Sequence, residues 1–336
     1  MENIRNTIGL SDIGEGARRQ YVNARSVFTA LEDASRQAAQ YRGGMYWKTH
    51  GKTGIMYLIR TQTDNSQTSL GPHTAESEAI YRKFTESKST IEARIRDLTK
   101  EMDLHRRLNR ALLVGRAPQL LVDIMNVFSR AGIAEHFRVI GTHAIYAYEA
   151  AAGVRIEKES ALETQDVDLL WAIERKIKFQ TRLKQNADSV IGLLKKVDKT
   201  FEVRPEQRYT AVNSRGFEVD IIRPATVADE DTVALVNPSR MTDYDDDLFA
   251  VKAPSAGGLQ GAPPFEALIV STGGSMARMR TVHPLEFVRV KRWLSHQPTR
   301  DIMKRDRDRL QAAIVEKLVE EYLPQLTLGH VKPELS

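Results

Sequence analysis

Two aspartates separated by one residue open a hydrophobic run in the middle of the chain. They are Asp166 and Asp168, in the stretch TQDVDLLWAI (164–173). The run predicts a buried strand, and side chains two residues apart on a strand project from the same face. Two carboxylates on one face repel each other unless a positive charge lies between them. Mg²⁺ fits this pattern, because it is usually held by one or two carboxylates together with substrate phosphates.

A third carboxylate occurs on a later predicted strand. Asp220 lies at the centre of GFEVDIIRP (216–224), whose alternation of polar and apolar residues is typical of a strand. If the two strands are neighbours, Asp166, Asp168 and Asp220 could hold two metal ions that clamp the attacking and leaving oxygens of a phosphoryl or nucleotidyl transfer. A strand edge with a solvated carboxylate pair has the same pattern, and the sequence leaves that alternative open.

A glycine and a threonine precede the aspartates at a junction between a strand and a helix. Gly141 ends the β-branched run FRVIG (137–141), and Thr142 opens the short predicted helix THAIYAYEAAAG (142–153). Glycine lets the backbone approach a phosphate, and a helix N-terminus supplies free N–H groups and a positive dipole. An ordinary capped turn would look similar, but the aspartates that follow favour a phosphate site.

The order of these motifs resembles the polymerase-β-type nucleotidyltransferase superfamily, whose motif is a Gly-Gly or Gly-Ser pair, Asp-x-Asp/Glu and a third carboxylate. More narrowly, VIGTHAIYAYEAAAGV, TQDVDLLW, GFEVDIIRP and NRALLVGRAP are similar to a branch of uncharacterised bacterial proteins assigned to this fold. The resemblance implies phosphate contact at Gly141 and Thr142 and metal ligation at Asp166 and Asp168. At Asp220 it implies metal ligation and activation of the acceptor hydroxyl. Two departures are Thr142 in the second motif position and a longer interval between Gly141 and Asp166.

The C-terminal helices resemble a second feature of such enzymes more weakly. FVRVKRWLS (287–295) and TRDIMKRDRD (299–308) are similar to the Lys-bearing and Lys-Asp-bearing helices of toxin-type nucleotidyltransferases. This resemblance implies that Lys291 contacts nucleotide phosphates and that Lys304 and Asp306 lie near the pocket. A charged helix face exposed to solvent is the alternative for each of them.

The amino-acid composition excludes several classes of protein and of site. The 336 residues carry a net charge of +5, 41% hydrophobic residues and no cysteine, which excludes a disulfide framework, a Cys-ligated zinc site and a thiol nucleophile. No run approaches the ~18 apolar residues of a membrane helix, and the first residues lack the pattern of a secretory signal. We therefore expect a cytoplasmic protein without membrane partners. Acidic residues at 229–247 precede basic residues at 278–309.

The elements that must position the site fall into three predicted regions. Residues 1–115 are expected to be a helical region with a β-hairpin, 116–225 a nucleotidyltransferase core and 226–336 a region with a hairpin and basic helices. The expected fold is α/β (α+β), a mixed sheet flanked by helices. The predicted elements are helices at 16–41, 74–112, 118–131, 142–153, 186–197, 284–296 and 299–323, strands at 137–141, 166–173, 200–205, 208–213 and 216–224, and hairpins at 45–60 and 266–282.

The function expected from these features is a Mg²⁺-dependent nucleotidyltransferase that holds two ions, with Mn²⁺ as a possible substitute. It would transfer NMP from an NTP to a hydroxyl of RNA, protein or a small molecule and release pyrophosphate. One alternative is an inactive protein of this fold that binds nucleic acid or a partner through its basic C-terminal helices, and another is a metal-dependent phosphohydrolase. The aromatic side chains of the first hairpin, Tyr46, Trp47 and Tyr57, fit either cross-strand packing or base stacking.

Overall fold

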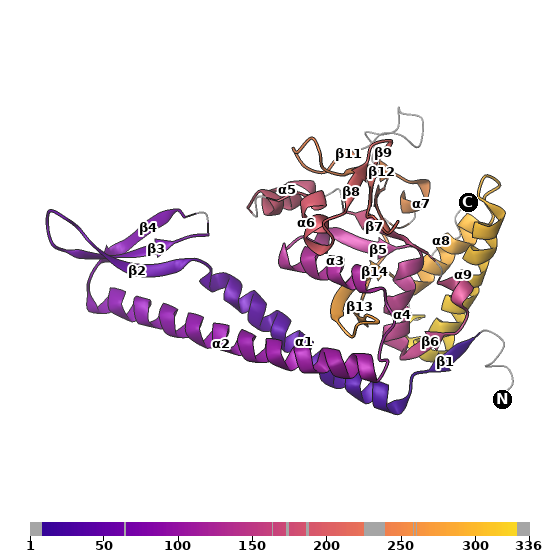
Figure 1. Ribbon diagram of the computed structural model, residues 1–336, viewed down its shortest axis with the longest axis horizontal. Coiled ribbons are helices and arrows are strands. Elements are labelled where there is room, and N and C mark those ends of the chain that lie inside the picture. The colour runs from indigo at the N-terminus through magenta and orange to yellow at the C-terminus, as the bar shows by residue number, and fades with distance from the viewer. Residues whose placement is uncertain are drawn as a thin grey trace. The chain divides into compact units, whose positions relative to one another are not determined.

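The computed structural model describes residues 9–63, 65–162, 164–172, 175–185, 188–224, 239–257, 259 and 261–327. These residues form two compact units (Figure 1). Arg19–Ala111 is the smaller unit, and the described residues up to Arg18 together with those from Leu112 onward form the larger one. The division into three regions remains a prediction.

The smaller unit is a pair of long helices with a three-stranded sheet between them in sequence. Helices α1 (Glu15–Ala38) and α2 (Ala75–Ala111) lie side by side, and Gln20 of α1 donates a 3.0 Å hydrogen bond to Asn109 of α2 (Figure 1). Strands β2 (Gly44–Thr49), β3 (Met56–Thr61) and β4 (Gln67–Pro72) pair antiparallel in that order. The two helices and the hairpin are confirmed. Strand β4 was not predicted, and its terminal proline is tolerated because β4 is an edge strand.

The larger unit is built on a nine-stranded mixed sheet, which confirms the predicted fold class. Its path runs β11, β12, β10, β7, β5, β14, β13, with β9 paired to β10 and β8 to β9. The pairs β7 with β10, β10 with β12 and β5 with β14 are parallel. The strands are β5 (Phe137–Ile140), β7 (Asp166–Trp171), β8 (Glu202–Arg204), β9 (Gln207–Val212), β10 (Glu218–Arg223), β11 (Ser239–Arg240), β12 (Phe249–Lys252), β13 (Pro264–Val270) and β14 (Met276–Val282).

Helices and a short two-stranded pairing complete the larger unit. The helices are α3 (Gln119–Arg130), α4 (Ile145–Ala152), α5 (Lys176–Gln185), α6 (Val190–Val197), α7 (Pro254–Gly257), α8 (Pro284–Ser295) and α9 (Ile302–Tyr322), and β1 (Leu10–Asp12) pairs with β6 (Val154–Ile156). The helices predicted at 118–131, 142–153, 284–296 and 299–323 are confirmed. Helix α5 and strands β1, β6, β11 and β12 were not predicted. Of the acidic stretch at 229–247, residues 229–238 lie outside the described residues.

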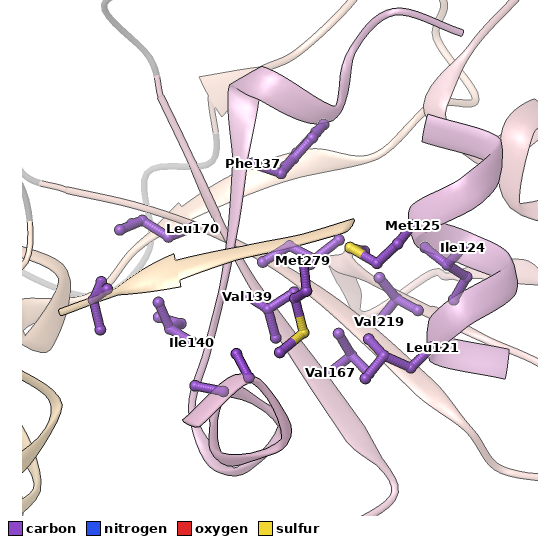
Figure 2. Packing of buried hydrophobic residues seen from close by; sticks show 14 of the residues in the cluster. Leu121, Ile124, Met125, Phe137, Val139, Ile140, Val167, Leu170, Val219 and Met279 are labelled. Carbon is purple, nitrogen blue, oxygen red and sulfur yellow. The ribbon is translucent and has the colours of Figure 1, made fainter. Parts of the chain in front are cut away.

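Alternating side chains of the central strands separate the core from the candidate site. Val167 of β7 and Val219 of β10 are fully buried and pack beside Leu121 and Ile124 of α3 (Figure 2). The residues that follow each valine therefore project from the opposite face of the sheet. These residues are Asp168 and Asp220.

Candidate active site

The register of three strands brings the predicted carboxylates together. In the parallel pairing of β7 with β10, Asp168 lies opposite Asp220 and Asp166 lies opposite Glu218. On its other side, Asp168 lies opposite Ile140, the last residue of β5. Because neighbouring strands are ~4.8 Å apart, Asp168 occupies the centre of a row that runs from the Gly141 turn to Asp220.

Gly141 has a backbone conformation and surroundings that suit glycine. Its φ of 67° and ψ of −156° lie in a region that residues with a side chain rarely occupy. A Cβ atom at this position would lie 2.2 Å from Oδ2 of Asp168. The missing side chain therefore lets the turn after β5 lie directly against the central carboxylate.

Threonine hydroxyls donate hydrogen bonds to Asp166 and Asp220, the carboxylates on either side of Asp168 in the chain. Thr164 donates a hydrogen bond to Asp166, and Thr210 of β9 donates one to Asp220. Thr210 is almost completely buried and lies opposite Asp220 in the antiparallel pairing of β9 with β10. The sheet therefore fixes the orientation of Asp220 as well as its position.

The three carboxylates line a cavity of about 320 Å³. Among the predicted site residues, Gly141, Thr142, Asp166, Asp168, Asp220, Lys291 and Lys304 line it. Two further cations, Arg300 and Arg307, also line it and were not predicted. The structure therefore places three carboxylates and four cations around one cavity, whose apolar wall includes Phe287, Val290 and Leu294 of α8.

Asp308 of α9 holds two of these cations. Lys291 Nζ lies 2.8 Å from Asp308 Oδ1, and Arg300 Nε donates a hydrogen bond to Oδ2. The side chain of Asp308 is 0% exposed and that of Lys291 is 7% exposed. Asp308 therefore holds a buried lysine from α8 and a partly exposed arginine from the α8–α9 connection in one cluster.

Asp306 requires a correction, because the structure does not place it at the cavity. Its side chain is 65% exposed and forms an ion pair with Arg309 at 2.8 Å. Two residues correspond to about 200° around a helix, so Asp306 and Asp308 point in nearly opposite directions. Lys304, Arg307, Asp308 and Gln311 follow the i, i+3, i+4, i+7 spacing of one face, and this face is the one turned towards the site.

The charges of the site alter the proton affinity of its central groups. Burial, followed by the charges of Asp166 and Asp220, raises the pKa of Asp168 to about 7, while Lys291 and Arg300 act in the opposite direction. Burial also raises the pKa of Asp220, against a hydrogen bond from Thr210. Burial lowers the pKa of Lys291, whereas Asp308 and Asp168 favour its charged form. Burial is thus the main cause of the raised pKa values of Asp168 and Asp220 and of the lowered pKa of Lys291.

A family model described as Nucleotidyltransferase matches residues 119–334, which is well over half of the chain. The chain belongs to this nucleotidyltransferase family. The resemblance predicted from the sequence is thereby confirmed at the family level, and it makes nucleotidyl transfer the general activity and an NTP the donor substrate. No curated protein and no solved structure matches the chain. Across the described residues, every helix is too short or too polar to cross a membrane. The expected cytoplasmic location stays a prediction.

The donor set of the nucleotidyltransferase suits a divalent cation. Asp166, Asp168 and Asp220 supply hard oxygen ligands, and the raised pKa of Asp168 shows that added positive charge would favour its ionised form. Among the described residues, no group of three His, Cys, Asp or Glu side chains already converges as a complete ligand set. Mg²⁺ at this site would therefore take part of its ligands from substrate phosphates and water. The roles of these residues stay predictions.

Helix α9 also supports the Gly-Thr turn of the nucleotidyltransferase. Gln311 Nε2 donates hydrogen bonds of 3.0 Å to Thr142 Oγ1 and 2.6 Å to the backbone carbonyl of Ala161. Thr142 and Gln311 are both buried. The hydroxyl of Thr142 therefore anchors the turn to α9.

Four residues of the site were not predicted from the sequence: two line the cavity, and two hold other residues of the site in place. Arg300, Arg307, Asp308 and Gln311 lie in or next to the TRDIMKRDRD stretch, and the helical spacing from Lys304 would have selected three of them. No sequence signal identifies Thr164 or Thr210 as hydrogen-bond donors to the site. Their contacts depend on strand pairing and on the fold.

Proposed function

We propose that this nucleotidyltransferase transfers NMP from an NTP to an acceptor hydroxyl in a Mg²⁺-dependent reaction that releases pyrophosphate. The observation that carries the proposal is the shared cavity in which Asp166, Asp168 and Asp220 face four lysine and arginine side chains. A triphosphate with its cation needs both kinds of charge in one place. The size of the cavity, about 320 Å³, is at the lower end of the range for small-molecule sites.

The cations would bind the triphosphate and neutralise the charge that develops on the leaving pyrophosphate. Arg300 and Arg307 present planar forks suited to phosphate oxygens, and Lys291 and Lys304 act as point charges. The turn at Gly141 and Thr142 presents backbone to the phosphates at the start of α4. Catalysis would then rest on positioning and electrostatic stabilisation.

The aspartates would hold the metal and orient the acceptor. Asp166, Asp168 and Asp220 are the ligands available at the cavity. Bound Mg²⁺, in one or two ions, would supply charge neutralisation and increase the acidity of the attacking hydroxyl. Asp220 lies at the end of the carboxylate row next to β9 and is held by Thr210, which suits it to receive the acceptor proton.

The alternative of an inactive binding protein is less well supported. It requires the basic C-terminal helices to present their cations to a large partner. Instead, Lys291, Arg300, Lys304 and Arg307 line the same cavity as the aspartates, and Lys291 is almost completely buried. This placement favours a small phosphorylated ligand over a broad interaction surface.

Label transfer tests the proposal directly. The full-length protein is incubated with each α-³²P-labelled NTP, Mg²⁺ and a mixture of cellular RNA, protein and small molecules, and the products are separated by class. We expect label in one acceptor class and equimolar pyrophosphate for the wild type, and none for Asp168→Asn. Asp245→Asn is the matched control, because Asp245 is 96% exposed and outside the cavity.

Two results would contradict the proposal. Absence of label in every acceptor with every NTP would count against transfer. Release of free NMP with pyrophosphate in the absence of any acceptor would identify a phosphohydrolase instead.

A further inference from the structure

The net positive charge of the chain lies in the smaller unit. Arg19–Ala111 contains 16 Lys and Arg against 10 Asp and Glu, a net charge of +6. The rest of the chain contains 33 Lys and Arg against 34 Asp and Glu, a net charge of −1. The unit that carries none of the candidate catalytic residues is therefore the one that attracts anions over long range.

One face of the sheet in this unit packs against α2. The Trp47 ring lies 5.8 Å from the ring of Tyr81, and the Arg60 guanidinium lies 4.4 Å from the centre of the Phe84 ring. Both partners are residues of α2. Trp47 and Arg60 therefore lie on the side of β2 and β3 that faces α2. Trp47 packs against Tyr81 and is not available for base stacking.

The opposite face carries the other aromatic residues of the hairpin. Tyr46 and Lys48 flank Trp47 on β2, so they project away from α2, and Tyr46 is 38% exposed. Tyr57 of β3 lies directly opposite Lys48 in the register. His50 is on the same side, since its ring lies 6.4 Å from that of Tyr57 in an edge-on arrangement. We call Tyr46, Lys48, His50 and Tyr57 the outer sheet face.

The surroundings of the outer sheet face are basic. The segment 42–73, which contains the sheet and its loops, has a single acidic residue. Its basic residues are Arg42, Lys48, Lys52 and Arg60, of which Arg60 lies on the helix-facing side. The exposed ring of Tyr46 and the partly exposed ring of Tyr57, with cations beside them, match the way in which proteins bind single-stranded nucleic acid. In such sites bases stack on the rings and cations contact the phosphates.

We propose that the outer sheet face is a binding site for single-stranded nucleic acid, with bases stacked on Tyr46 and Tyr57 and a phosphate contacted by Lys48. A protein partner with an acidic surface would use the same charge but would not require the exposed ring of Tyr46 and the partly exposed ring of Tyr57 beside a lysine. The site is separate from the cavity in the larger unit. It does not depend on the proposed reaction, because binding is measured without turnover.

Fluorescence anisotropy with full-length Asp168→Asn protein tests the site. The probes are a fluorescein-labelled 16-nucleotide oligouridylate and the DNA oligothymidylate of the same length, which separate RNA from DNA. We expect saturable binding, weakened roughly tenfold or more by Tyr46→Ala or Tyr57→Ala. Tyr46→Phe should restore most of the affinity because it keeps a ring. Lys48→Ala should reduce the slope of log K against log salt by about 0.7.

Matched controls use exposed side chains of the larger unit. Tyr244, which is 44% exposed, and the exposed Lys199 lie outside the cavity, so Tyr244→Ala and Lys199→Ala should bind like the parent protein. Circular dichroism shows whether each variant is folded. The proposal is overturned if neither probe binds, if folded Tyr46→Ala and Tyr57→Ala proteins bind like the parent, or if poly-glutamate competes as well as unlabelled oligonucleotide.

Discussion

At the scale of single residues, the contact between Gly141 and Asp168 is the most restrictive in the site. A methyl group on Gly141 would overlap Asp168 Oδ2, and the backbone there has a φ of 67°. We expect Gly141→Ala to reduce kcat/KM for NMP transfer by at least about 100-fold, since displacement of a positioned group by about 1 Å has this effect. Backbone strain should lower the free energy of unfolding by about 1–3 kcal/mol. Steady-state kinetics and urea denaturation measure the two effects.

The control for this change is a glycine in open space. Gly261 has no heavy atom within 4 Å of an added Cβ, so Gly261→Ala should leave both quantities unchanged. Wild-type activity in Gly141→Ala would show that Asp168 does not need its place beside the turn.

Asp308 forms ion pairs with two cations of the cavity, the buried Lys291 and the partly exposed Arg300. Removing its charge leaves Lys291 without its partner at 2.8 Å and leaves Arg300 with a weaker acceptor. We expect Asp308→Asn to lower the free energy of unfolding by about 3–5 kcal/mol, the usual cost of breaking a buried pair, and to raise the KM for the NTP. Denaturation and kinetics report these changes separately.

Two comparisons show whether Asp308 acts through its cations. Asp306→Asn should change the free energy of unfolding by less than about 0.5 kcal/mol, because Asp306 is exposed. The double variant Lys291→Met with Asp308→Leu should recover much of the stability but not the activity, since an apolar pair can replace a buried ion pair in packing but not in phosphate binding. Recovery of activity would contradict the assigned role.

At the scale of elements, the central strands could be predicted because their pattern is local. The valine–aspartate alternation in β7 and β10 assigns one face to the core beside α3 and the other to Asp168 and Asp220. The sequence did not show that β7 pairs with β10, because the two strands are separated in the chain. Their register, and with it the contact of Gly141 with Asp168, is a property of the folded sheet.

The elements that the sequence did not reveal depend on tertiary partners. Strand β4 contains glycine and proline and exists because β3 offers it a pairing edge. Helix α5 has a charged sequence and a buried Phe179 that packs on Trp171. The choice between Asp306 and Asp308 required knowledge of which side of α9 meets α8, and a resemblance in sequence did not contain that information.

The turn after α6 supports the strand that carries Asp220 and gives a pH-dependent prediction. Asp198 at the end of α6 accepts hydrogen bonds from Thr200, and from Asn213 and Arg215 in the β9–β10 connection. Bonds from Thr200 contribute most to lowering the pKa of Asp198 from 3.8 to about 2. The folded state thus binds this proton less tightly than the unfolded state, so the stabilisation is complete above about pH 4 and disappears as the pH falls from 3.8 to 2.

We therefore expect Asp198→Asn to be less stable than the wild type at pH 6, with a difference that shrinks between pH 4 and pH 2. Urea denaturation across this range measures it. The exposed Asp245→Asn is the control. A difference that does not vary with pH would show that the carboxylate charge is not what holds the turn.

At the scale of the whole molecule, the net positive charge is divided unequally between the two compact units. Four cations of the larger unit line the cavity beside the aspartates, and this unit has almost no net charge. The smaller unit has the excess positive charge and an exposed aromatic face. Under the two proposals, the four cations at the cavity bind the NTP, and the smaller unit, rather than the basic C-terminal helices, binds a longer polyanion.

Each unit also has its own buried residues, which predicts how ligands alter unfolding. The main hydrophobic cluster of the described residues belongs to the larger unit, whereas Ala24, Ala34 and Leu58 are buried within the smaller one. We expect calorimetry of the full-length protein to show two transitions. Mg²⁺ with an NTP should raise only the one that belongs to the larger unit, by about 2.7 kcal/mol at a ligand concentration 100 times Kd. Because a ligand stabilises only the unit that binds it, Asp168→Asn should abolish this shift and Tyr46→Ala should not. A shift of both transitions together would show that the units unfold as one.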